Sequence, residues 1–190
     1  ELAVASGQVK TALALAGLNA DGVTEGHEPV PSRDDTELML NVLGVTISRV
    51  DPRTFRVARS APVAFELDVP GDPSSAAFFA VAACILPGSE LVLRGVALNP
   101  TRIGFVSVLR RMGANIEVSV TGDQLGEAVG DLVIAAAPLH GTIIHGPEIP
   151  TLIDEIPVLA VAAAYADGVT EVRDDGEMRV KESDRIATTV

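Results

Sequence analysis

Residues 179–185 (RVKESDR) contain three cationic and two acidic side chains within a short run near the end of the chain. They follow residues 156–166, an apolar helical stretch that carries no charge. A buried element therefore brings both signs of charge to one place, as an acid/base site or an anion-binding site requires. The alternative interpretation is a solvated helix face with ion pairs along it.

The cations of this run, Arg179, Lys181 and Arg185, lie beside an expected helix start, where Glu182 and Asp184 are favoured in the first turn. On one helix, Lys181 and Arg185 would share a face at i, i+4 and would repel each other weakly. An anion bound at the helix N-terminus would turn that repulsion into attraction. Alternatively, the two acids simply neutralise the cations.

Asp154 directly precedes the third of three apolar helices expected in the chain, and an acid at such a position is commonly a cap or a dipole partner. The corresponding positions before the other two helices hold short polar residues, Ser6 and Gln8 in one case and residues 72–75 (DPSS) in the other. Ser6 and Gln8 suit anion binding, whereas Asp154 suits abstraction of a proton from a hydroxyl group. For residues 72–75 we prefer a plain helix cap.

Arg33 lies in residues 32–37 (SRDDTE), which open another expected helix. Its guanidinium presents a fixed fork of donors that matches phosphate geometry, and Ser32 precedes it. Thr36 or Asp34 in this segment can be explained as an ordinary N-cap.

The composition limits the classes of partner and compartment. The formal net charge of −12 argues against nucleic acid, because phosphate backbones require clustered Lys and Arg. No apolar stretch reaches the roughly 18 to 20 residues that span a bilayer, so no membrane association is expected. The one cysteine, Cys84, lies in an apolar run and indicates a reducing, cytoplasmic location. The histidines (His27, His140 and His145) have no metal-ligand spacing, and no metal or cofactor is expected.

The chain also repeats itself, which indicates a modular architecture. The sequence ADGVTE occurs identically at residues 20–25 and 166–171, with a looser copy at residues 86–91. In each copy a glycine ends a helix and a β-prone segment follows. Helices are predicted over residues 9–19, 35–43, 76–85, 102–112 and 156–165, and strands over residues 23–25, 45–48, 64–69, 91–94, 114–118, 131–135, 141–145 and 169–172.

The repeat predicts that the chain begins and ends inside a repeat unit. The spacing from Gly88 to Gly113 in the middle unit, applied to Gly168, places the next helix-ending glycine beyond Val190. The first unit lacks an opening strand. We therefore expect a segment of a longer protein.

The polar motifs, taken in order, resemble those of the 5-enolpyruvylshikimate-3-phosphate (EPSP) synthase family, and most closely its bacterial glyphosate-tolerant class. The matching segments span the whole chain: residues 6–12 (SGQVKTA), 32–37 (SRDDTE), 68–75 (DVPGDPSS), 99–102 (NPTR), 153–157 (IDEIP) and 179–185 (RVKESDR).

The resemblance implies an α/β fold of βαβαββ repeat units, arranged in the two-lobed enolpyruvyl transferase fold, an inside-out α/β barrel. Residues 1–68 would be the last repeat unit of the first lobe. Residues 69–190 would hold the first two units of the second lobe, the second of them truncated. The fold would thus be incomplete at both ends.

The resemblance also implies a reaction without metal or organic cofactor, in which the enolpyruvyl group of phosphoenolpyruvate moves to the 5-hydroxyl of shikimate 3-phosphate and phosphate is released. Carried over by motif, Ser6 and Arg33 would hold the phosphate of shikimate 3-phosphate, with Ser32 nearby as a further substrate-binding residue, and Gln8 would lie between the substrates. Asp154 would bind the hydroxyls and act as base. Lys181 and Glu182 would transfer protons, and Arg185 would bind the phosphoenolpyruvate carboxylate. The substrates would lie between these two groups of residues, in a protein that is monomeric at full length.

Two alternatives remain at this point. The related transferase acting on UDP-N-acetylglucosamine uses a reactive cysteine and lacks the pattern of residues 181–185. The other alternative is a non-catalytic repeat fragment that acts as a folding or interaction module. Because the charge of −12 suits two polyanionic substrates poorly, we expect these residues alone to bind substrate weakly and to turn it over negligibly.

Overall fold

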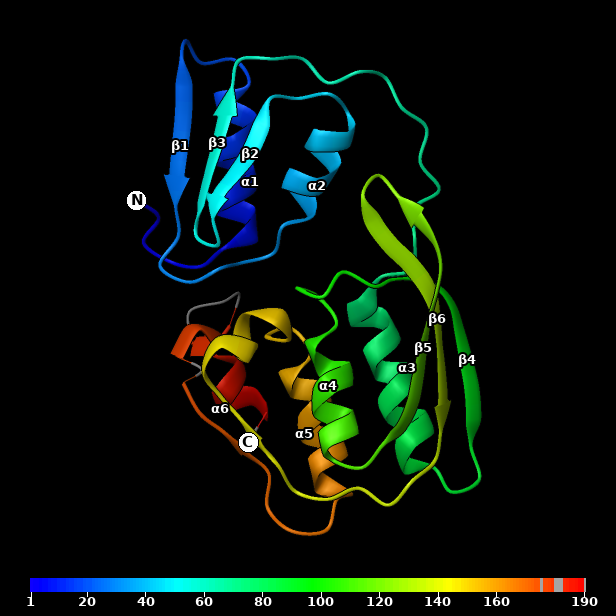
Figure 1. Cartoon of the computed structure of the whole chain (residues 1–190). Helices are drawn as coiled ribbons and strands as arrows, with labels where there is room; N and C mark the ends of the chain where they lie inside the picture. Colours follow the sequence, from blue (N-terminus) through cyan, green and yellow to red (C-terminus); the bar gives the residue numbers. More distant parts are fainter. Residues whose placement is uncertain (175, 180–182, 190) are drawn as a thin grey trace. The chain divides into compact units, whose positions relative to one another are not determined.

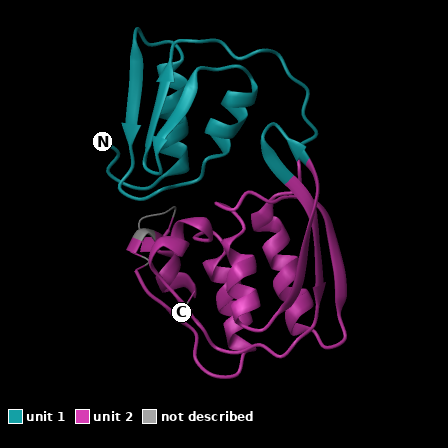
Figure 2. Cartoon of the chain, viewed as in Figure 1, with its two compact units in different colours: residues 1–69, 123–128 teal, residues 70–122, 129–190 magenta. Residues whose placement is uncertain are grey.

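A computed structural model of the chain describes residues 1–174, 176–179 and 183–189. The chain forms an α/β structure whose elements are labelled in Figure 1. It divides into two compact units, coloured separately in Figure 2: residues 1–69 with 123–128, and residues 70–122 with 129–190. Each unit is described by itself.

The first unit is a three-stranded antiparallel sheet with two helices. Its elements are α1 (Gly7–Gly17), β1 (Val23–His27), α2 (Asp35–Val42), β2 (Ile47–Asp51) and β3 (Thr54–Ala58). The strand order is β1-β3-β2, so the last strand of the unit lies in the middle. Helix α1 packs on β1 and β3, and α2 packs on β2. The core consists of Ala14, Leu18, Leu40, Val45, Ile47, Phe55 and Val57.

The second unit contains the same arrangement of elements. They are α3 (Pro73–Ile85), β4 (Glu90–Ala97), α4 (Gly104–Arg111), β5 (Asn115–Gln124) and β6 (Glu127–Ala135). The strand order is β4-β6-β5, again with the last strand in the middle. The repeat predicted from the sequence is therefore confirmed at the level of sheet topology.

A third repeat follows in the second unit. Its elements are β7 (Ile143–Ile144), the 3₁₀ helix η1 (Gly146–Thr151), α5 (Ile156–Ala164), β8 (Glu171–Val172), the 3₁₀ helix η2 (Gly176–Arg179) and α6 (Arg185–Thr189). Strands β7 and β8 pair in parallel, as expected for a crossover through a helix.

One connection recurs in all three repeats: the chain before the first helix runs alongside the strand that follows that helix. The Leu2 amide donates to the His27 carbonyl at 2.8 Å, and the Gly71 amide donates to the Gly95 carbonyl at 2.7 Å. In the third repeat, β7 precedes α5 and pairs in parallel with β8, the strand that follows α5.

The glycines predicted to end the first helix of each repeat adopt the required conformation. Gly22, Gly88 and Gly168 have φ of +86°, +76° and +92°, a region that glycine enters without a Cβ clash. Helices α1, α3 and α5 themselves end at Gly17, Ile85 and Ala164, so these glycines lie in the turns after the helices and not at the helix ends. Gly44 and Gly113, with φ of +79° and +100°, directly follow the C-cap residues of α2 and α4, as predicted.

The strand predicted over residues 64–69 was wrong, because this segment has no strand pairing and is mostly exposed. Its alternating apolar and acidic residues imitate a half-buried strand. The sequence prediction also missed β3, the central strand of the first sheet. In β3, Arg56 interrupts the apolar residues and pairs outward with Glu25, which hides the strand in a charged segment.

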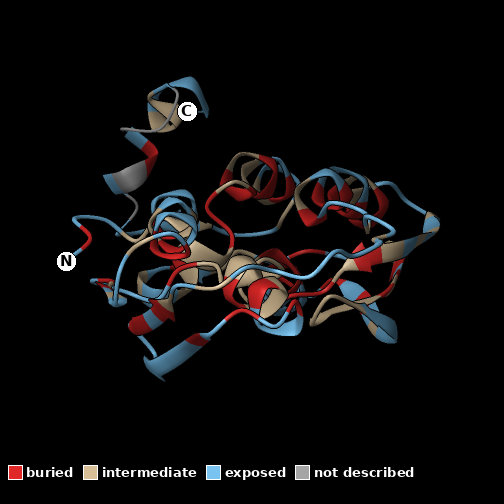
Figure 3. Ribbon diagram, turned by 90° about the horizontal axis from the view of Figure 1, so that it is seen from above, coloured by how far each residue is buried: buried red, intermediate tan, exposed pale blue. Residues whose placement is uncertain are grey.

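Burial follows the layers of each unit, and the helices have one buried and one exposed face (Figure 3). The main helices of the second unit are rich in small apolar residues, and α3 buries Ala76, Ala77, Ala80 and Ala83. Across the described ranges, none of the helices is both long and apolar enough to cross a bilayer.

Candidate active site

Ser6 begins helix α1. Its Oγ accepts a hydrogen bond from the Val9 amide at 3.3 Å, so the hydroxyl caps the helix. Gln8 lies in the first turn and is exposed. The free amides and the dipole at a helix start attract anions. Ser6 and Gln8 are therefore placed where an anionic group can be bound.

Arg33 lies against this same helix start. A Cβ built on Gly7 would be 3.2 Å from the Cβ of Arg33 and 3.7 Å from its Cδ. The stem of Arg33 thus crosses close to the first residue of α1. The first unit therefore brings together Ser6 and Arg33, which the sequence motifs had assigned to one phosphate.

Ser32 differs from the simple expectation of a side chain turned toward a ligand. It is 4% exposed. Its Oγ donates a very short hydrogen bond to Glu28 Oε1, and its carbonyl accepts a bond from Lys10 Nζ at 3.4 Å. The Ser32 hydroxyl is thus turned into the interior, where it holds the segment that carries Arg33.

A buried ionic cluster lies behind these residues, and the sequence prediction missed it. Lys10 is 0% exposed and pairs with Glu28 Oε2 at 3.2 Å and with Glu37 Oε1 at 3.0 Å. Arg49 Nη2 also contacts Glu37 Oε1 at 3.1 Å. The available signal was Lys10 itself, a lone charge in the apolar run of α1.

In the second unit, three helices begin at the same end. Figure 1 shows α3, α4 and α5 running alongside one another in the same direction. Ser74, in the first turn of α3, donates to Glu155 Oε1 at 2.5 Å. Glu155 is the N-cap residue of α5 and is 1% exposed. A hydrogen bond therefore links the starts of α3 and α5.

Arg102 connects the segment before α4 to the same place. Its Nη2 donates to Asp72 Oδ1 at 2.9 Å and to Ser74 Oγ at 3.3 Å. Asp72 caps α3 by accepting bonds from the amides of Ser74 and Ser75, which confirms the helix cap expected there. The positive ends of three helix dipoles are thus held together in this unit.

Asp154 and Arg185 form an ion pair at this end of the second unit. Arg185 Nη1 lies 2.8 Å from Asp154 Oδ1, and their side chains are 21% and 28% exposed, respectively. Arg185 is the first residue of α6, and Asp154 directly precedes the N-cap of α5. The structure therefore joins two predicted site residues that lie far apart in the sequence.

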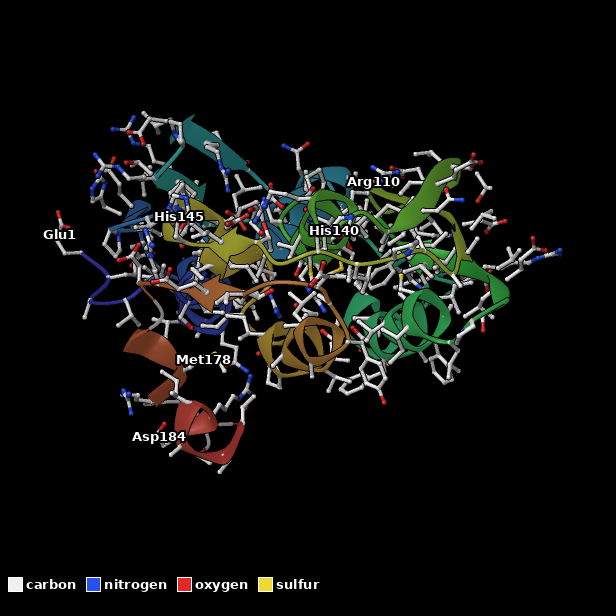
Figure 4. The ribbon with its side chains drawn as sticks, turned by 90° about the horizontal axis from the view of Figure 1, so that it is seen from below. Glu1, Arg110, His140, His145, Met178 and Asp184 are labelled. Carbon is white, nitrogen blue, oxygen red and sulfur yellow. The ribbon has the colours of Figure 1, made fainter. Side chains whose placement is uncertain are left out.

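The rest of the charged C-terminal run is described in part. Met178 and Asp184 lie on the C-terminal segment (Figure 4). Asp184 accepts bonds from the Ala187 amide at 3.0 Å and from Arg179 at 3.1 Å, and these contacts lower the pKa of its carboxyl group. Lys181 and Glu182 lie outside the described residues.

No cluster of metal ligands occurs within residues 1–174, 176–179 and 183–189. His140 and His145 lie apart in Figure 4. Cys84 is buried, which raises the pKa of its thiol to about 11. Such a thiol is a poor nucleophile at neutral pH.

The chemistry available is therefore anion binding together with proton transfer. In the first unit, a helix start, the Ser6 region and Arg33 offer donors to a phosphate group. In the second unit, the Asp154 carboxylate can accept a proton from a hydroxyl group. The planar donor fork of the Arg185 guanidinium matches the geometry of a carboxylate or phosphate group.

Comparison with known proteins gives one consistent result. A family model described as EPSP synthase (3-phosphoshikimate 1-carboxyvinyltransferase) matches residues 1–190. The 3-phosphoshikimate 1-carboxyvinyltransferases of Desulforudis audaxviator and Chloroflexus aggregans are 53% and 55% identical to this chain, each over 99% of it. The match covers 44% of each relative, so the chain spans less than half of their length.

Solved structures agree. EPSP synthase from Acinetobacter baumannii matches with a TM-score of 0.89 and 40% identity, over 99% of this chain and 42% of that one. The enolpyruvyl transferase NikO from Streptomyces tendae matches with a TM-score of 0.64 at 23% identity, over 88% of this chain and 39% of that one, and it supports the fold alone. Because the family model matches all 190 residues of this chain, the chain belongs to the EPSP synthase family.

Proposed function

We propose that the protein containing this chain transfers the enolpyruvyl group of phosphoenolpyruvate to the 5-hydroxyl of shikimate 3-phosphate and releases phosphate. The observation that carries the proposal is the ion pair of Asp154 and Arg185, because it joins a candidate base to a candidate carboxylate-binding group within a chain of this family. The arrangement of Arg33 beside the start of α1 supports it independently.

In the proposed reaction, Ser6 and Arg33 bind the phosphate of shikimate 3-phosphate, and Gln8 contacts both substrates. Ser32 contributes by holding the segment before Arg33, since its hydroxyl is engaged by Glu28. Arg185 binds the carboxylate of phosphoenolpyruvate through its guanidinium group, whose donor fork matches a carboxylate.

The chemical step begins when Asp154 removes the proton of the 5-hydroxyl group. The hydroxyl oxygen bonds to C2 of phosphoenolpyruvate, and the methylene carbon takes up a proton to become a methyl group. Loss of a proton from that methyl group then restores the double bond as the carbon–oxygen bond to phosphate breaks. Lys181 and Glu182 are the proposed partners for the two proton transfers at this carbon. This series of chemical steps requires neither a metal nor an organic cofactor.

The related transfer to UDP-N-acetylglucosamine is the disfavoured alternative. The relatives at 53% and 55% identity are 3-phosphoshikimate 1-carboxyvinyltransferases, and the one cysteine within these 190 residues, Cys84, is buried with a raised pKa. We further propose that the full-length protein acts on small molecules in the cytoplasm and that the boundary near residue 69 separates parts of two lobes. We also propose that it is a monomer, which light scattering would detect.

The test is phosphate release by the natural full-length protein. Release should require both phosphoenolpyruvate and shikimate 3-phosphate, and UDP-N-acetylglucosamine should not replace the second substrate. Phosphate release with UDP-N-acetylglucosamine would favour the alternative transferase. No heat on titration with millimolar shikimate 3-phosphate would instead favour a non-catalytic module.

A further inference from the structure

Lys10 is a buried lysine of the first unit, and it joins three segments of the chain: α1, the segment after β1, and α2. It projects from α1, one helical turn after Ser6, whose carbonyl accepts the Lys10 amide at 3.0 Å. Its ammonium reaches Glu28 and Ser32 in the segment after β1, and Glu37 in α2. A single side chain therefore ties both helices of the unit to the segment between them.

The ammonium group of Lys10 has an acceptor for each of its three N–H donors. These acceptors are Glu28 Oε2 at 3.2 Å, Glu37 Oε1 at 3.0 Å and the Ser32 carbonyl at 3.4 Å. A buried charge is tolerated only with such complete pairing. The directions of three bonds also fix where the ammonium and its partners lie.

Ser32 is anchored twice by this cluster. Lys10 holds its carbonyl, and Glu28, oriented by Lys10, accepts the bond from its hydroxyl. Arg33 is the next residue, and its stem lies against Gly7 at the start of α1. The backbone from which Arg33 projects is thus fixed relative to the helix start by contacts of Lys10.

We propose that Lys10 is a positioning residue that sets the location of Arg33 at the start of α1, and thereby the affinity for the phosphorylated substrate. Lys10 itself is 0% exposed, so it acts through Ser32 and Arg33 and not by touching the substrate. The inference rests on the proposed function for the identity of that substrate.

Stability alone does not account for the cluster. Replacing a buried ion pair with well-packed apolar residues is often neutral or stabilising. An apolar side chain at position 10 would fill the interior, but it could not hold the Ser32 carbonyl. The ionic cluster therefore supplies orientation that apolar packing lacks.

The test is a double variant of the full-length protein, Lys10→Met combined with Glu28→Gln. The single change Lys10→Met would leave the Glu28 carboxylate buried without a cation and could unfold the unit. The glutamine introduced at position 28 keeps an oxygen for the Ser32 hydroxyl, and Glu37 keeps Arg49 as its partner. The double variant removes the Lys10 bond to the Ser32 carbonyl together with the ion pairs of Lys10 to Glu28 and Glu37.

We expect KM for shikimate 3-phosphate to rise about tenfold, because weakening one hydrogen bond to a charged group costs about one order of magnitude in affinity. KM for phosphoenolpyruvate and kcat should stay within about twofold of the wild type. A loss of folded protein would lower the apparent kcat and leave KM unchanged. The control is Arg56→Met, which breaks an exposed pair with Glu25 on the same sheet and should leave both KM values unchanged.

An unchanged KM for shikimate 3-phosphate in the double variant would overturn the inference. If the wild type shows no transfer, the proposed function fails separately. A crystal structure of the double variant then decides the positioning role: displacement of Arg33 from Gly7 supports it, and an unmoved Arg33 refutes it.

Discussion

At the scale of single residues, the contact between Asp154 and Arg185 is expected to contribute little to the stability of the fold but much to the rate of the reaction. Both side chains are partly exposed, at 28% and 21%, and ion pairs of this kind contribute about 0–1 kcal/mol to the free energy of unfolding. A carboxylate that acts as general base contributes about 10²–10⁴-fold to the rate. The same substitution should therefore affect turnover far more than folding.

We predict that Asp154→Ala in the full-length protein lowers kcat by about two orders of magnitude or more. The melting temperature should change by only a few degrees, because a partly exposed ion pair is lost. Kinetic assays and thermal unfolding check the two halves of this prediction. The matched control is Asp21→Ala, which removes an exposed acid paired with Arg59 and should leave kcat unaltered. Retained activity in Asp154→Ala would show that the assigned base is wrong.

The cap residue Asp72 makes stability depend on pH. Burial opposes ionisation of its carboxyl group, but bonds from Ser75 and Ser74 and the charge of Arg102 outweigh burial and lower its pKa. A carboxyl group with a lowered pKa in the folded state stabilises that state above the unfolded value, and this stabilisation is lost as the pH falls through the folded value.

We therefore predict that Asp72→Ala lowers the free energy of unfolding by about 1 kcal/mol at neutral pH, through loss of the helix cap. The difference from the wild type should shrink below about pH 4, near and below the pKa of an unfolded aspartate. Urea unfolding at a series of pH values measures this difference. Asp68→Ala changes an exposed acid of the neighbouring segment and serves as the comparison. A difference that stayed constant down to pH 2 would contradict the prediction.

At the scale of elements, strand β1 lies so close to β3 that it has no room for a side chain at Gly26. A Cβ there would collide with the ring of Phe55, which is 1% exposed in the core. Gly122 in β5 has nothing within 4 Å of the same position and has no positive φ. The two strand glycines thus form a natural pair for comparison.

We predict that Gly26→Ala lowers the free energy of unfolding by about 1–3 kcal/mol, the usual cost of overpacking a core. Gly122→Ala should be neutral or slightly stabilising, because alanine restricts the unfolded chain. Denaturant unfolding of both variants would measure the difference. Equal stability of the two variants would mean that β1 does not pack on Phe55 as described.

Helix ends were predictable because their cause is local. Gly44 and Gly113 end α2 and α4 through their own backbone conformation, which no distant residue has to supply. Strands depend on partners instead. Residues 64–69 alternate as well as a true strand but find no partner, while β3 is central despite a poorer pattern.

The candidate site was predictable to the extent that its residue types reveal chemistry. Arg33 and Asp154 could be selected from sequence because a fixed donor fork and a carboxylate at a helix start have recognisable uses. The inward orientation of the Ser32 side chain could not be predicted from sequence. It depends on Glu28 and Lys10, which meet only after α1 packs against the segment that follows β1.

At the scale of the whole molecule, the chain carries a charge of −12 and spans 44% of the curated relatives it matches. Two anionic substrates need more cationic groups than Arg33, Lys181 and Arg185 supply. The remaining length of the relatives is where such groups would be found.

We predict that the 190-residue chain alone turns over no measurable substrate and binds shikimate 3-phosphate weakly. Phosphate-release assays and titration calorimetry would measure both properties, and the full-length protein provides the reference. A rate close to that of the full-length protein would contradict the prediction.

The closure of each sheet within its own repeat bears on how the protein is synthesised. Strand β1 is paired along β3, from Val23 with Ala58 to His27 with Thr54, so the first sheet can form once residue 58 has emerged from the ribosome. Domains fold in this N-terminal-first order during translation, and misassembly between similar units is a characteristic failure of repeat proteins. The second ADGVTE segment, at residues 166–171, is synthesised well after residue 58, so the partner strand of the first segment is available before the second segment exists. Vectorial synthesis thereby protects two identical segments from exchanging places.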